Sequence, residues 1–190
     1  MLDAPFLRST FAAALPYEAY VETASPAHLP RWRDMESRIA LTDAQQQLLR
    51  AFVRPVNILV SSGTWCGDCV AQCPMFRAFE KANPALIALR LVDRDEHKDL
   101  ADRVMISEGN RVPVFIFMNE DFDFISLMGD RSLTRYRAIA ARQLGASCPV
   151  PGAPIPADEL ARTIQDWLDE LERVHLLCRL SPKLRAKHAD

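Results

Sequence analysis

Two cysteines, Cys66 and Cys69, have the spacing of a redox pair. They stand three residues apart at the predicted start of a helix, so both sulfur atoms lie on the same side of it. That separation allows a disulfide after small backbone adjustments. Free N–H groups and the helix dipole favour an anion at Cys66, which predicts a lowered thiol pKa and an attacking thiolate. Cys69 lies one turn deeper, where we expect it to resolve the mixed disulfide.

Asp68, between the two cysteines, opposes the effect of the helix terminus. A carboxylate about 6 Å from the sulfur costs the thiolate about 0.7 kcal/mol in water, and more where water is excluded. Because a charged residue at a helix start points into solvent, we expect Asp68 to be exposed and its effect to be small. Replacing Asp68 by asparagine or proline should lower the pKa of Cys66.

The remaining cysteines leave other interpretations open. With the pair, Cys73 and Cys148 could hold zinc or an iron–sulfur cluster, but the sequence has no second Cys-x-x-Cys. We therefore predict a redox dithiol and no bound metal. Cys73 could act as a third thiol that accepts a disulfide from Cys69, but a buried, unreactive side chain is the simpler interpretation. Cys178 lies on an apolar helix face and is predicted to be in the core.

The composition of the 190 residues, 49% hydrophobic and 25% charged, is that of an ordinary globular protein. A formal net charge of −2 gives no indication of binding to nucleic acid or to anionic membranes. No apolar run approaches the ~18 residues of a membrane span, and we find no secretory signal. We therefore expect a cytoplasmic location, where a close cysteine pair is more often catalytic or metal-binding than structural.

The elements that position Cys66 follow from the hydrophobic pattern. Strands are predicted at 56–60, 87–92, 114–118 and 122–128, and helices at 66–81, 96–106 and 132–144. This order predicts an α/β fold with a mixed central sheet of about four strands flanked by helices. The first strands, joined by helices, should be parallel, and the last two should form a hairpin. Gly145 is the expected C-cap of the last of these helices.

Further helices are predicted on both sides of this region. Thr42 and Gln45 predict a capping box and a helix to about Arg54. After a proline-rich linker, residues 157–180 have the apolar stripe of a packing helix, and we expect the basic tail 183–188 to be frayed. We divide the chain into three parts: a helical N-terminal extension packed on the core (1–55), a core domain (56–145), and a linker with a C-terminal helix (146–190).

The run Trp65-Cys66-Gly67-Asp68-Cys69 resembles the Trp-Cys-Gly-Pro-Cys motif of the thioredoxin superfamily. Three more features resemble that family in the same order. Pro74 matches a kinking proline in the active-site helix, Val112-Pro113 matches the cis-proline dipeptide, and Gly129 matches a glycine near the substrate groove. The match covers about residues 56–144 and implies a thioredoxin-like fold. The longer N- and C-terminal helices resemble a group of bacterial thioredoxin-like proteins.

The resemblance implies roles for the matched residues. Cys66 would attack, Cys69 would resolve, and Pro113 would be cis. The implied substrate-binding residues are Trp65, Gly67, Asp68, Val112, Pro113 and Gly129, with the Val112 backbone pairing with an extended substrate segment. Two positions depart from the family: Asp68 replaces its proline, and Val60 replaces a buried acidic residue that takes the proton of the resolving cysteine. These departures leave the base for Cys69 unidentified.

The predicted function is thiol–disulfide oxidoreduction, in which the Cys66–Cys69 dithiol exchanges with disulfides of proteins or small thiols. No cofactor is expected beyond the redox-active disulfide, and an unidentified reductase or thiol would supply electrons. No nucleic-acid or membrane partner is expected. The alternative is a non-catalytic thioredoxin-fold adaptor, or a carrier of zinc or of an iron–sulfur cluster.

Overall fold

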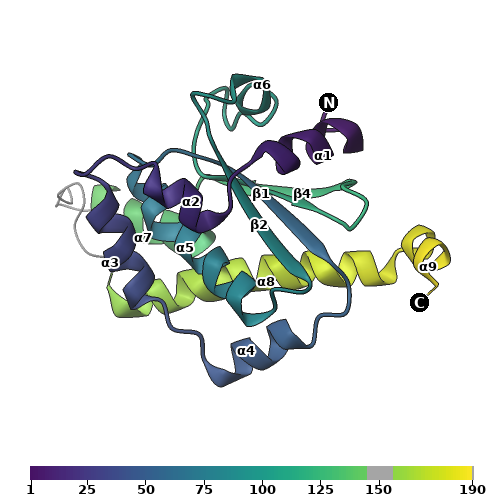
Figure 1. Cartoon of the computed structure of the whole chain (residues 1–190). Coiled ribbons are helices and arrows are strands. Elements are labelled where there is room, and N and C mark those ends of the chain that lie inside the picture. The colour runs from purple at the N-terminus through teal and green to yellow at the C-terminus, as the bar shows by residue number, and fades with distance from the viewer. Residues whose placement is uncertain (145–155, 190) are drawn as a thin grey trace.

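The computed structural model describes residues 1–144 and 156–189 (Figure 1). The N-terminal helices are α1 (Ala4–Ala13), α2 (Tyr17–Glu22), α3 (Leu29–Arg38) and α4 (Asp43–Arg50). The central elements are β1 (Val56–Ser62), α5 (Gly67–Ala82), β2 (Ile87–Asp93), α6 (Lys98–Ala101), β3 (Val114–Met118), β4 (Phe124–Gly129) and α7 (Leu133–Leu144). The C-terminal helices are α8 (Ala157–Leu180) and α9 (Pro182–His188). Within the described residues, a four-stranded sheet has the order β2-β1-β3-β4, so the predicted fold class is confirmed.

The strand directions are predicted correctly except for β3. β1 and β2 are parallel, with Val56 opposite Ile87, and β3 and β4 form the predicted hairpin. The prediction of parallel strands is wrong for β3, which runs antiparallel to β1 with Val114 opposite Ser61. The connection between β2 and β3 contains only the four-residue helix α6 in place of the long crossover helix that was predicted, and the chain does not return along the sheet before β3. β3 therefore begins at the same end of the sheet at which β1 and β2 finish.

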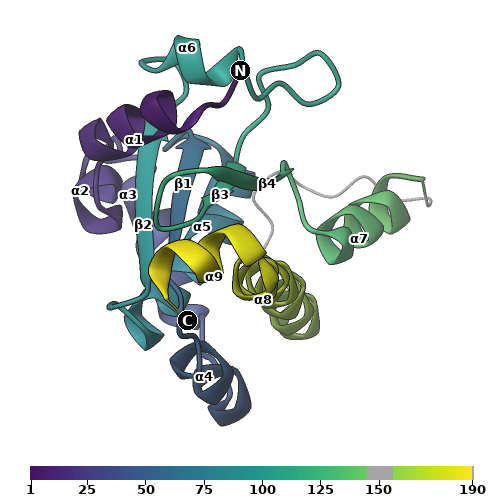
Figure 2. The same ribbon diagram turned by 90° about the vertical axis from the view of Figure 1, so that its right-hand side faces the viewer.

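Different helices cover the two faces of the sheet (Figures 1 and 2). Helices α2, α3, α5 and α8 form one core with Ile58 and Val60 of β1. On the other face, Leu7 of α1 and Leu100 of α6 form a second cluster with Leu59. Since side chains alternate along a strand, β1 supplies both clusters. Burial on both faces accounts for the three consecutive apolar residues from Ile58 to Val60.

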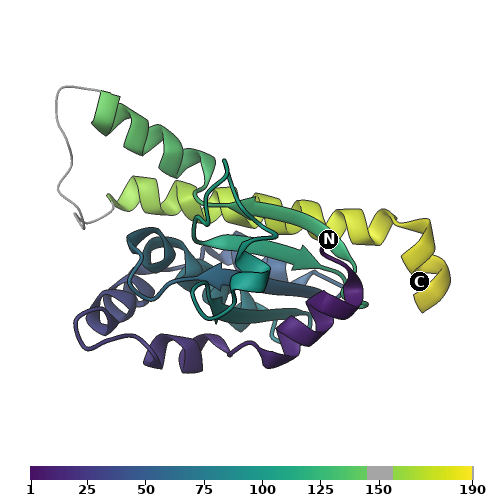
Figure 3. The same ribbon diagram turned by 90° about the horizontal axis from the view of Figure 1, so that it is seen from above.

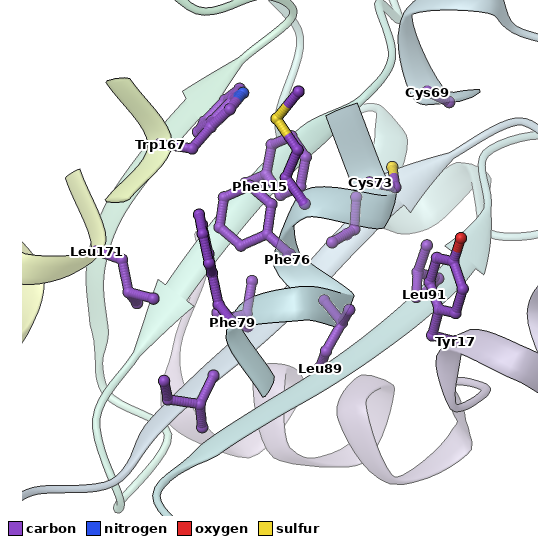
Figure 4. Close-up of a cluster of buried hydrophobic side chains, with 14 of the residues drawn as sticks. Tyr17, Cys69, Cys73, Phe76, Phe79, Leu89, Leu91, Phe115, Trp167 and Leu171 are labelled. Atoms are coloured by element: carbon purple, nitrogen blue, oxygen red, sulfur yellow. The ribbon is translucent and has the colours of Figure 1, made fainter. Parts of the chain in front are cut away.

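An aromatic cluster joins α5, β3 and α8 (Figure 4). The rings of Phe76 and Phe115 stack with centroids 4.2 Å apart, and Trp167 of α8 lies 5.2 Å from Phe76 and 4.4 Å from Phe115. Figure 3 shows α8 running along the sheet with α7 beside it. The predicted packing role of the apolar stripe on 157–180 is therefore confirmed, and Cys178 is buried in this helix as expected.

Some predicted elements differ in length from the observed ones. The capping box of Thr42 and Gln45 is present, but α4 ends at Arg50 rather than near Arg54. β1 continues to Ser62, two residues beyond the predicted strand 56–60. This extension carries the strand to the residue just before the loop that holds the cysteines.

The region after β2 is less regular than predicted. Of the predicted helix 96–106, only Lys98–Ala101 form an α-helix, and Ser107 and Glu108 have positive φ values of 52° and 58°. These angles, just beyond the predicted end, rule out a right-handed helix at residues 107 and 108. A tight turn joined by the Ile106 and Gly109 backbones follows instead.

The basic tail is ordered, which contradicts its prediction as frayed. Residues 182–188 form α9, capped by the Ser181 hydroxyl, which accepts from the Leu184 N–H. Leu184 is buried, and Lys187 pairs with Asp121 of the β3–β4 turn at 2.7 Å. The tail is held by contacts with a turn more than 60 residues earlier, which local sequence cannot reveal.

The N-terminal helices pack directly on the sheet and on α5. A bridge joins Leu15 to Leu91 of β2, and Trp32 of α3 is fully buried in the core that contains α5. The division of the chain at residues 55 and 145 stays a prediction. Gly145, the proline-rich linker and Cys148 lie outside the described residues. Among the helices of 1–144 and 156–189, none combines the length and apolar character needed to cross a membrane.

Stability should depend on pH through His175 of α8. Its Nε2 accepts from the Val53 N–H at 3.1 Å, and its ring stacks on Phe52. Burial lowers the pKa of His175, and the charges of Arg179 and Arg54 act in the same direction. The neutral imidazole of His175 therefore stabilises the fold above its unfolded pKa of about 6.5. This contribution to the free energy of unfolding is lost as the pH falls below that value.

We expect His175→Phe to lower the free energy of unfolding by about 1–2 kcal/mol at pH 7.5, because the Val53 N–H loses its acceptor. The difference from wild type should shrink at pH 5.5, because only the wild type must then protonate a buried imidazole. Urea unfolding at both pH values measures this difference. An equal difference at both values would contradict it, and His28→Gln serves as a surface control.

Candidate active site

The cysteine pair lies where β1 ends and α5 begins. Cys66 is the N-cap of α5 and is half-buried, with extended backbone angles of φ −79° and ψ 125°. Cys69 lies in the first turn of the helix and is fully buried. The N-cap position places the first free backbone N–H groups of the helix near the Cys66 sulfur. The strand and helix predicted to position the pair are both present.

Both thiols contact the backbone of neighbouring loops. The Cys66 thiol donates to the Val112 carbonyl with a sulfur–oxygen distance of 3.5 Å. The Gly63 N–H donates to the Cys69 sulfur at 3.4 Å. The described cysteines are all free thiols, namely Cys66, Cys69, Cys73 and Cys178. No disulfide joins the described cysteines.

The prediction of a lowered pKa at Cys66 is wrong. A hydrogen bond with the Cys69 thiol and burial together raise the pKa of Cys66 well above its ordinary value. The backbone N–H groups of Cys69 and Asp68 lower it, as expected at a helix start, but the other two effects are larger. Burial likewise raises the pKa of Cys69. The pair thus holds both protons at neutral pH.

The loop before β3 and the end of β4 form one side of the site. The Val112–Pro113 peptide bond is cis. A side chain at position 129 would place its Cβ 2.5 Å from the Pro113 carbonyl oxygen and 3.2 Å from Ile106, so only glycine fits there. Val112, Pro113 and Gly129, far apart in sequence from Cys66, are thereby brought to the side on which its thiol lies.

Trp65 and Gly67 flank Cys66 within the motif. The Trp65 side chain packs over Gly63 and is 43% exposed, with the Arg94 guanidinium 4.9 Å above its ring. Gly67 leaves room for the Arg31 guanidinium. A Cβ at position 67 would lie 3.3 Å from an Arg31 nitrogen. Both residues thus lie at the accessible side of the pair.

The N-terminal helices support the loop that carries the motif. Trp32 of α3 donates its indole N–H to the Thr64 carbonyl at 2.9 Å. Because Trp32 is completely buried, this bond fixes the loop to a rigid part of the core. The sequence offered no signal for it, since the two residues are joined only by the fold.

Asp68 is not solvent-exposed, which contradicts its prediction. Its carboxylate accepts from Arg131 at 2.6 Å and from Arg135 at 3.2 Å, and its side chain is only 17% exposed. Arg135 also pairs with Glu159 of α8 at 2.6 Å. Asp68 therefore joins the start of α5 to α7 and α8 rather than facing water, and its charge is compensated by two guanidinium groups.

Asp130 completes this ion-pair network from the loop after β4. Its carboxylate lies 3.3 Å from both Arg111 and Arg131 and accepts from the Tyr136 hydroxyl. Burial alone would raise the pKa of Asp130. The hydrogen bond from Tyr136 and the nearby arginines outweigh burial, so the pKa of Asp130 lies below its ordinary value. The Gly129–Asp130 peptide bond is also cis.

Gln72 is the residue that connects these parts most directly. Its side-chain amide donates to the carbonyls of Asp68 and Asp130 at 3.1 and 3.0 Å. Its oxygen accepts from the Ser132 N–H at 3.0 Å and from the Trp167 indole at 3.2 Å. Sequence reasoning missed Gln72. A polar residue on the apolar face of a helix between Cys69 and Pro74 was the available signal.

Beneath the pair, Cys73 is fully buried and its sulfur lies 3.9 Å from the Ser62 hydroxyl oxygen. Val60 is buried in the core as an apolar side chain. Within residues 1–144 and 156–189, no three His, Cys, Asp or Glu side chains are grouped to hold a metal ion. Cys148, the fourth ligand of the metal hypothesis, lies outside this part of the chain.

Comparison with known proteins fits this geometry. The sequence model of the family described as Thioredoxin matches residues 14–139. The chain belongs to the thioredoxin family. Thioredoxin-1 of Caenorhabditis elegans is 32% identical over 72 residues, which are 38% of this chain and 59% of the relative. Thioredoxin H-type of Oryza sativa subsp. indica is 29% identical over 76 residues, which are 40% of this chain and 59% of the relative. The chain thus spans 59% of the length of these curated thioredoxins.

A solved structure shares more of the chain than these thioredoxins do. A protein of unknown function from Pseudomonas aeruginosa superposes with a TM-score of 0.69 at 19% identity, covering 90% of this chain and 98% of that one. An HIV epitope-scaffold superposes with a TM-score of 0.68 at 17% identity, covering 87% of this chain and 96% of that one. This likeness concerns the fold alone. It shows that helices beyond the thioredoxin core are part of a shared architecture.

In this member of the thioredoxin family, Asp68→Asn tests the ion-pair network. We expect a loss of about 1–3 kcal/mol in the free energy of unfolding, because Arg131 and Arg135 lose a largely buried partner. The pKa of Cys66 should fall, because the positive charges of Arg131 and Arg135 lose their compensating carboxylate at the start of α5. Thiolate absorbance against pH and urea unfolding measure the two effects. Asp34→Asn, at an exposed carboxylate of α3, should change neither, and a stable Asp68→Asn protein would contradict the network's role.

Proposed function

We propose that the protein is a thiol–disulfide oxidoreductase whose Cys66–Cys69 dithiol exchanges with disulfides of proteins or small thiols. Membership of the thioredoxin family supports such a function in general. The observation that carries the proposal is the arrangement of the pair: a half-buried thiol at the N-cap of α5, above a fully buried thiol one turn deeper. This arrangement gives one sulfur access to substrate and protects the other.

The exchange follows from this difference in access. The Cys66 thiolate attacks one sulfur of the substrate disulfide, a Cys66–substrate bond forms, and the other substrate sulfur leaves as a thiolate. Cys69 then attacks the Cys66 sulfur, which forms the Cys66–Cys69 disulfide and releases the second substrate thiolate. A reductase or small thiol returns two electrons to the pair. The proposal needs no cofactor beyond this disulfide, and the cytoplasmic location stays a prediction.

The substrate-facing residues are proposed from their positions around Cys66. Trp65, Gly67 and Val112 lie beside its sulfur or on the same accessible side, and Pro113 and Gly129 form the adjoining backbone wall. Asp68 is proposed to act through the arginines that hold it rather than by contact with substrate. Cys73 is proposed to remain a buried thiol during turnover.

Insulin reduction with dithiothreitol as electron donor tests the proposal. We expect wild-type activity that Cys66→Ser abolishes, whereas Cys178→Ser, at a buried thiol of α8, retains it. Activity should rise from pH 7 to pH 9, because the raised pKa of Cys66 keeps it protonated at neutral pH. Activity that survives Cys66→Ser would refute the enzyme, and its absence from the wild type would favour the adaptor or carrier alternative.

A further inference from the structure

Four arginines lie around the redox pair, each beside a residue that adjoins Cys66 in the site. They come from separate parts of the chain, which are α3 for Arg31, the residue after β2 for Arg94, the loop before β3 for Arg111 and the loop after β4 for Arg131. With a formal net charge of −2, the chain is not basic overall. The gathering of arginines at the site is therefore a local feature.

Arg31 is an unpaired cation at the start of α5. Its guanidinium lies against Gly67, where a Cβ would come within 3.3 Å of an Arg31 nitrogen. The side chain is exposed, and within the part of the chain that the structure describes its guanidinium forms no hydrogen bond or ion pair. Helix α3, which carries it, packs beside α5 (Figure 1), and the next residue, Trp32, is hydrogen-bonded to the motif loop. Arg31 is thereby held beside the residue that follows Cys66.

Arg111 and Arg131 are cations whose carboxylate partners lie beneath them. Arg111 directly precedes Val112, whose carbonyl accepts from the Cys66 thiol. Its side chain is 45% exposed, whereas that of its partner Asp130 is only 6% exposed. Arg131 is likewise more exposed than either of the two carboxylates that it contacts. The guanidinium groups therefore face outward and the carboxylates inward.

The ion-pair network beside the site contains more arginines than carboxylates. Its carboxylates are those of Asp68, Asp130 and Glu159, and its arginines are Arg111, Arg131, Arg135 and Arg142. Arg31 adds a further positive charge that has no partner in the described part of the chain. Because the inward carboxylates are all compensated and guanidinium groups remain in excess, the surface that these groups form beside Cys66 carries a net positive charge.

Arg94 differs from the other three arginines, because its charge is compensated. The Asp95 carboxylate accepts from its guanidinium at 3.0 and 3.1 Å, and the Asn110 carbonyl accepts at 2.9 Å. Arg94 thus contacts the Trp65 ring but adds little charge to the surface. We therefore define the arginine rim as Arg31, Arg111 and Arg131.

We propose that the arginine rim selects substrate disulfides that lie in acidic polypeptide segments. The inference rests on the exchange proposed above and names its class of substrate. Because the substrate sulfur must reach Cys66, the residues that flank it pass beside Gly67 and Val112. Carboxylates at these flanking positions meet Arg31 and Arg111, and guanidinium groups bind carboxylates through charge-assisted hydrogen bonds. The positive field also raises the rate of encounter with an acidic partner.

The members of the arginine rim differ in the donors that they have free. Arg31 has no partner among the described residues, so a substrate carboxylate pairs with it without displacing another group. Of the N–H donors of Arg111, only those of one terminal nitrogen are turned to Asp130. Both terminal nitrogens of Arg131 are bonded to carboxylates. We therefore expect Arg31 and Arg111 to bind substrate and Arg131 to contribute through its charge.

Three synthetic peptides that differ only beside their disulfide test the proposal. Each peptide contains one intramolecular disulfide, and the residues that flank its cysteines are glutamate, glutamine or lysine. With dithiothreitol as electron donor, and after subtraction of the uncatalysed rate, we expect kcat/KM to fall in that order. The glutamate peptide should exceed the lysine peptide about tenfold at ~20 mM salt, and the difference should shrink at ~300 mM salt, because salt screens exposed charges.

Substitutions in the arginine rim should reduce this preference, measured as the ratio of kcat/KM for the glutamate and lysine peptides. Arg31→Gln and Arg111→Gln should each lower the ratio about twofold to fivefold, as for the loss of one exposed ion pair. Arg31→Lys should retain most of it, because the charge is kept. Arg33→Gln is the matched control, since it removes the same charge from a different face of α3. A general loss of stability or of thiol reactivity cancels in the ratio.

Three results would overturn the selection of acidic substrates by the arginine rim. They are equal kcat/KM values for the three peptides in the wild type, a ratio that survives both Arg31→Gln and Arg111→Gln, and an equal drop of the ratio in Arg33→Gln. In each case the wild type still reduces disulfides, so the proposed exchange stands. A wild type that reduces none of the peptides would instead overturn the exchange, and the selection with it.

Discussion

Serine in place of Cys69 is expected to stop turnover and to leave substrate covalently bound through Cys66. Cys66 retains its N-cap position and its access, so the first exchange still occurs. The mixed disulfide then lacks the buried thiol that would release it. We expect steady-state reduction to fall by at least about 1,000-fold, as when a residue of a covalent mechanism is removed. Non-reducing electrophoresis and mass spectrometry should show the adduct.

Cys73→Ser is the matched control, since Cys73 lies one turn further along α5 and is also fully buried. It should turn over at a rate close to that of the wild type and accumulate no adduct. If Cys69→Ser releases product normally, Cys69 is not the resolving thiol. If only the Cys69→Ser Cys73→Ser double variant accumulates the adduct, Cys73 can resolve in its place and acts as a third thiol.

Leucine in place of Gln72 is expected to cost about 3–5 kcal/mol in the free energy of unfolding. Leucine removes a side chain that pairs the Asp130 carbonyl, the Ser132 N–H and the Trp167 indole, all in the interior of the protein. Each group then stays buried without a partner, at about 1–3 kcal/mol apiece before relaxation. Because the loop after β4 adjoins the site, reduction of substrate should also slow.

Urea unfolding measures the stability of Gln72→Leu, and insulin reduction measures its activity. Gln165→Leu is a suitable control, because Gln165 lies on the exposed face of α8 and its loss should cost no more than about 0.5 kcal/mol. A Gln72→Leu protein as stable as the control would show that the four hydrogen bonds of Gln72 contribute little.

The sequence predicts the core of the fold because its signals are local. Short apolar runs bounded by turns give β1 to β4 within two residues, and the capping box of Thr42 gives the start of α4. The direction of β3 depends on whether its connection crosses the sheet, which periodicity does not report. The order of the tail depends on Leu184 and Lys187 meeting other elements. Neither is a property of a local segment.

The candidate site divides in the same way. The spacing of Cys66 and Cys69, with the strand before them, is a local pattern and gave the position of the pair on α5. The environment of Asp68 was predicted wrongly because its partners Arg131 and Arg135 follow 63 and 67 residues later. The raised pKa of Cys66 likewise comes from burial and from the neighbouring thiol, which outweigh the helix terminus.

The unequal burial of the tryptophans makes the protein its own optical reporter. The chain has three tryptophans, of which Trp32 and Trp167 are fully buried and Trp65 is 43% exposed beside Cys66. A soluble quencher such as acrylamide therefore reaches Trp65 first, while emission from the other two reports the integrity of the core. Because a disulfide quenches a neighbouring indole, the quencher-sensitive part of the emission should follow the oxidation state of the pair. Redox titration then needs no attached dye and no added chromophore.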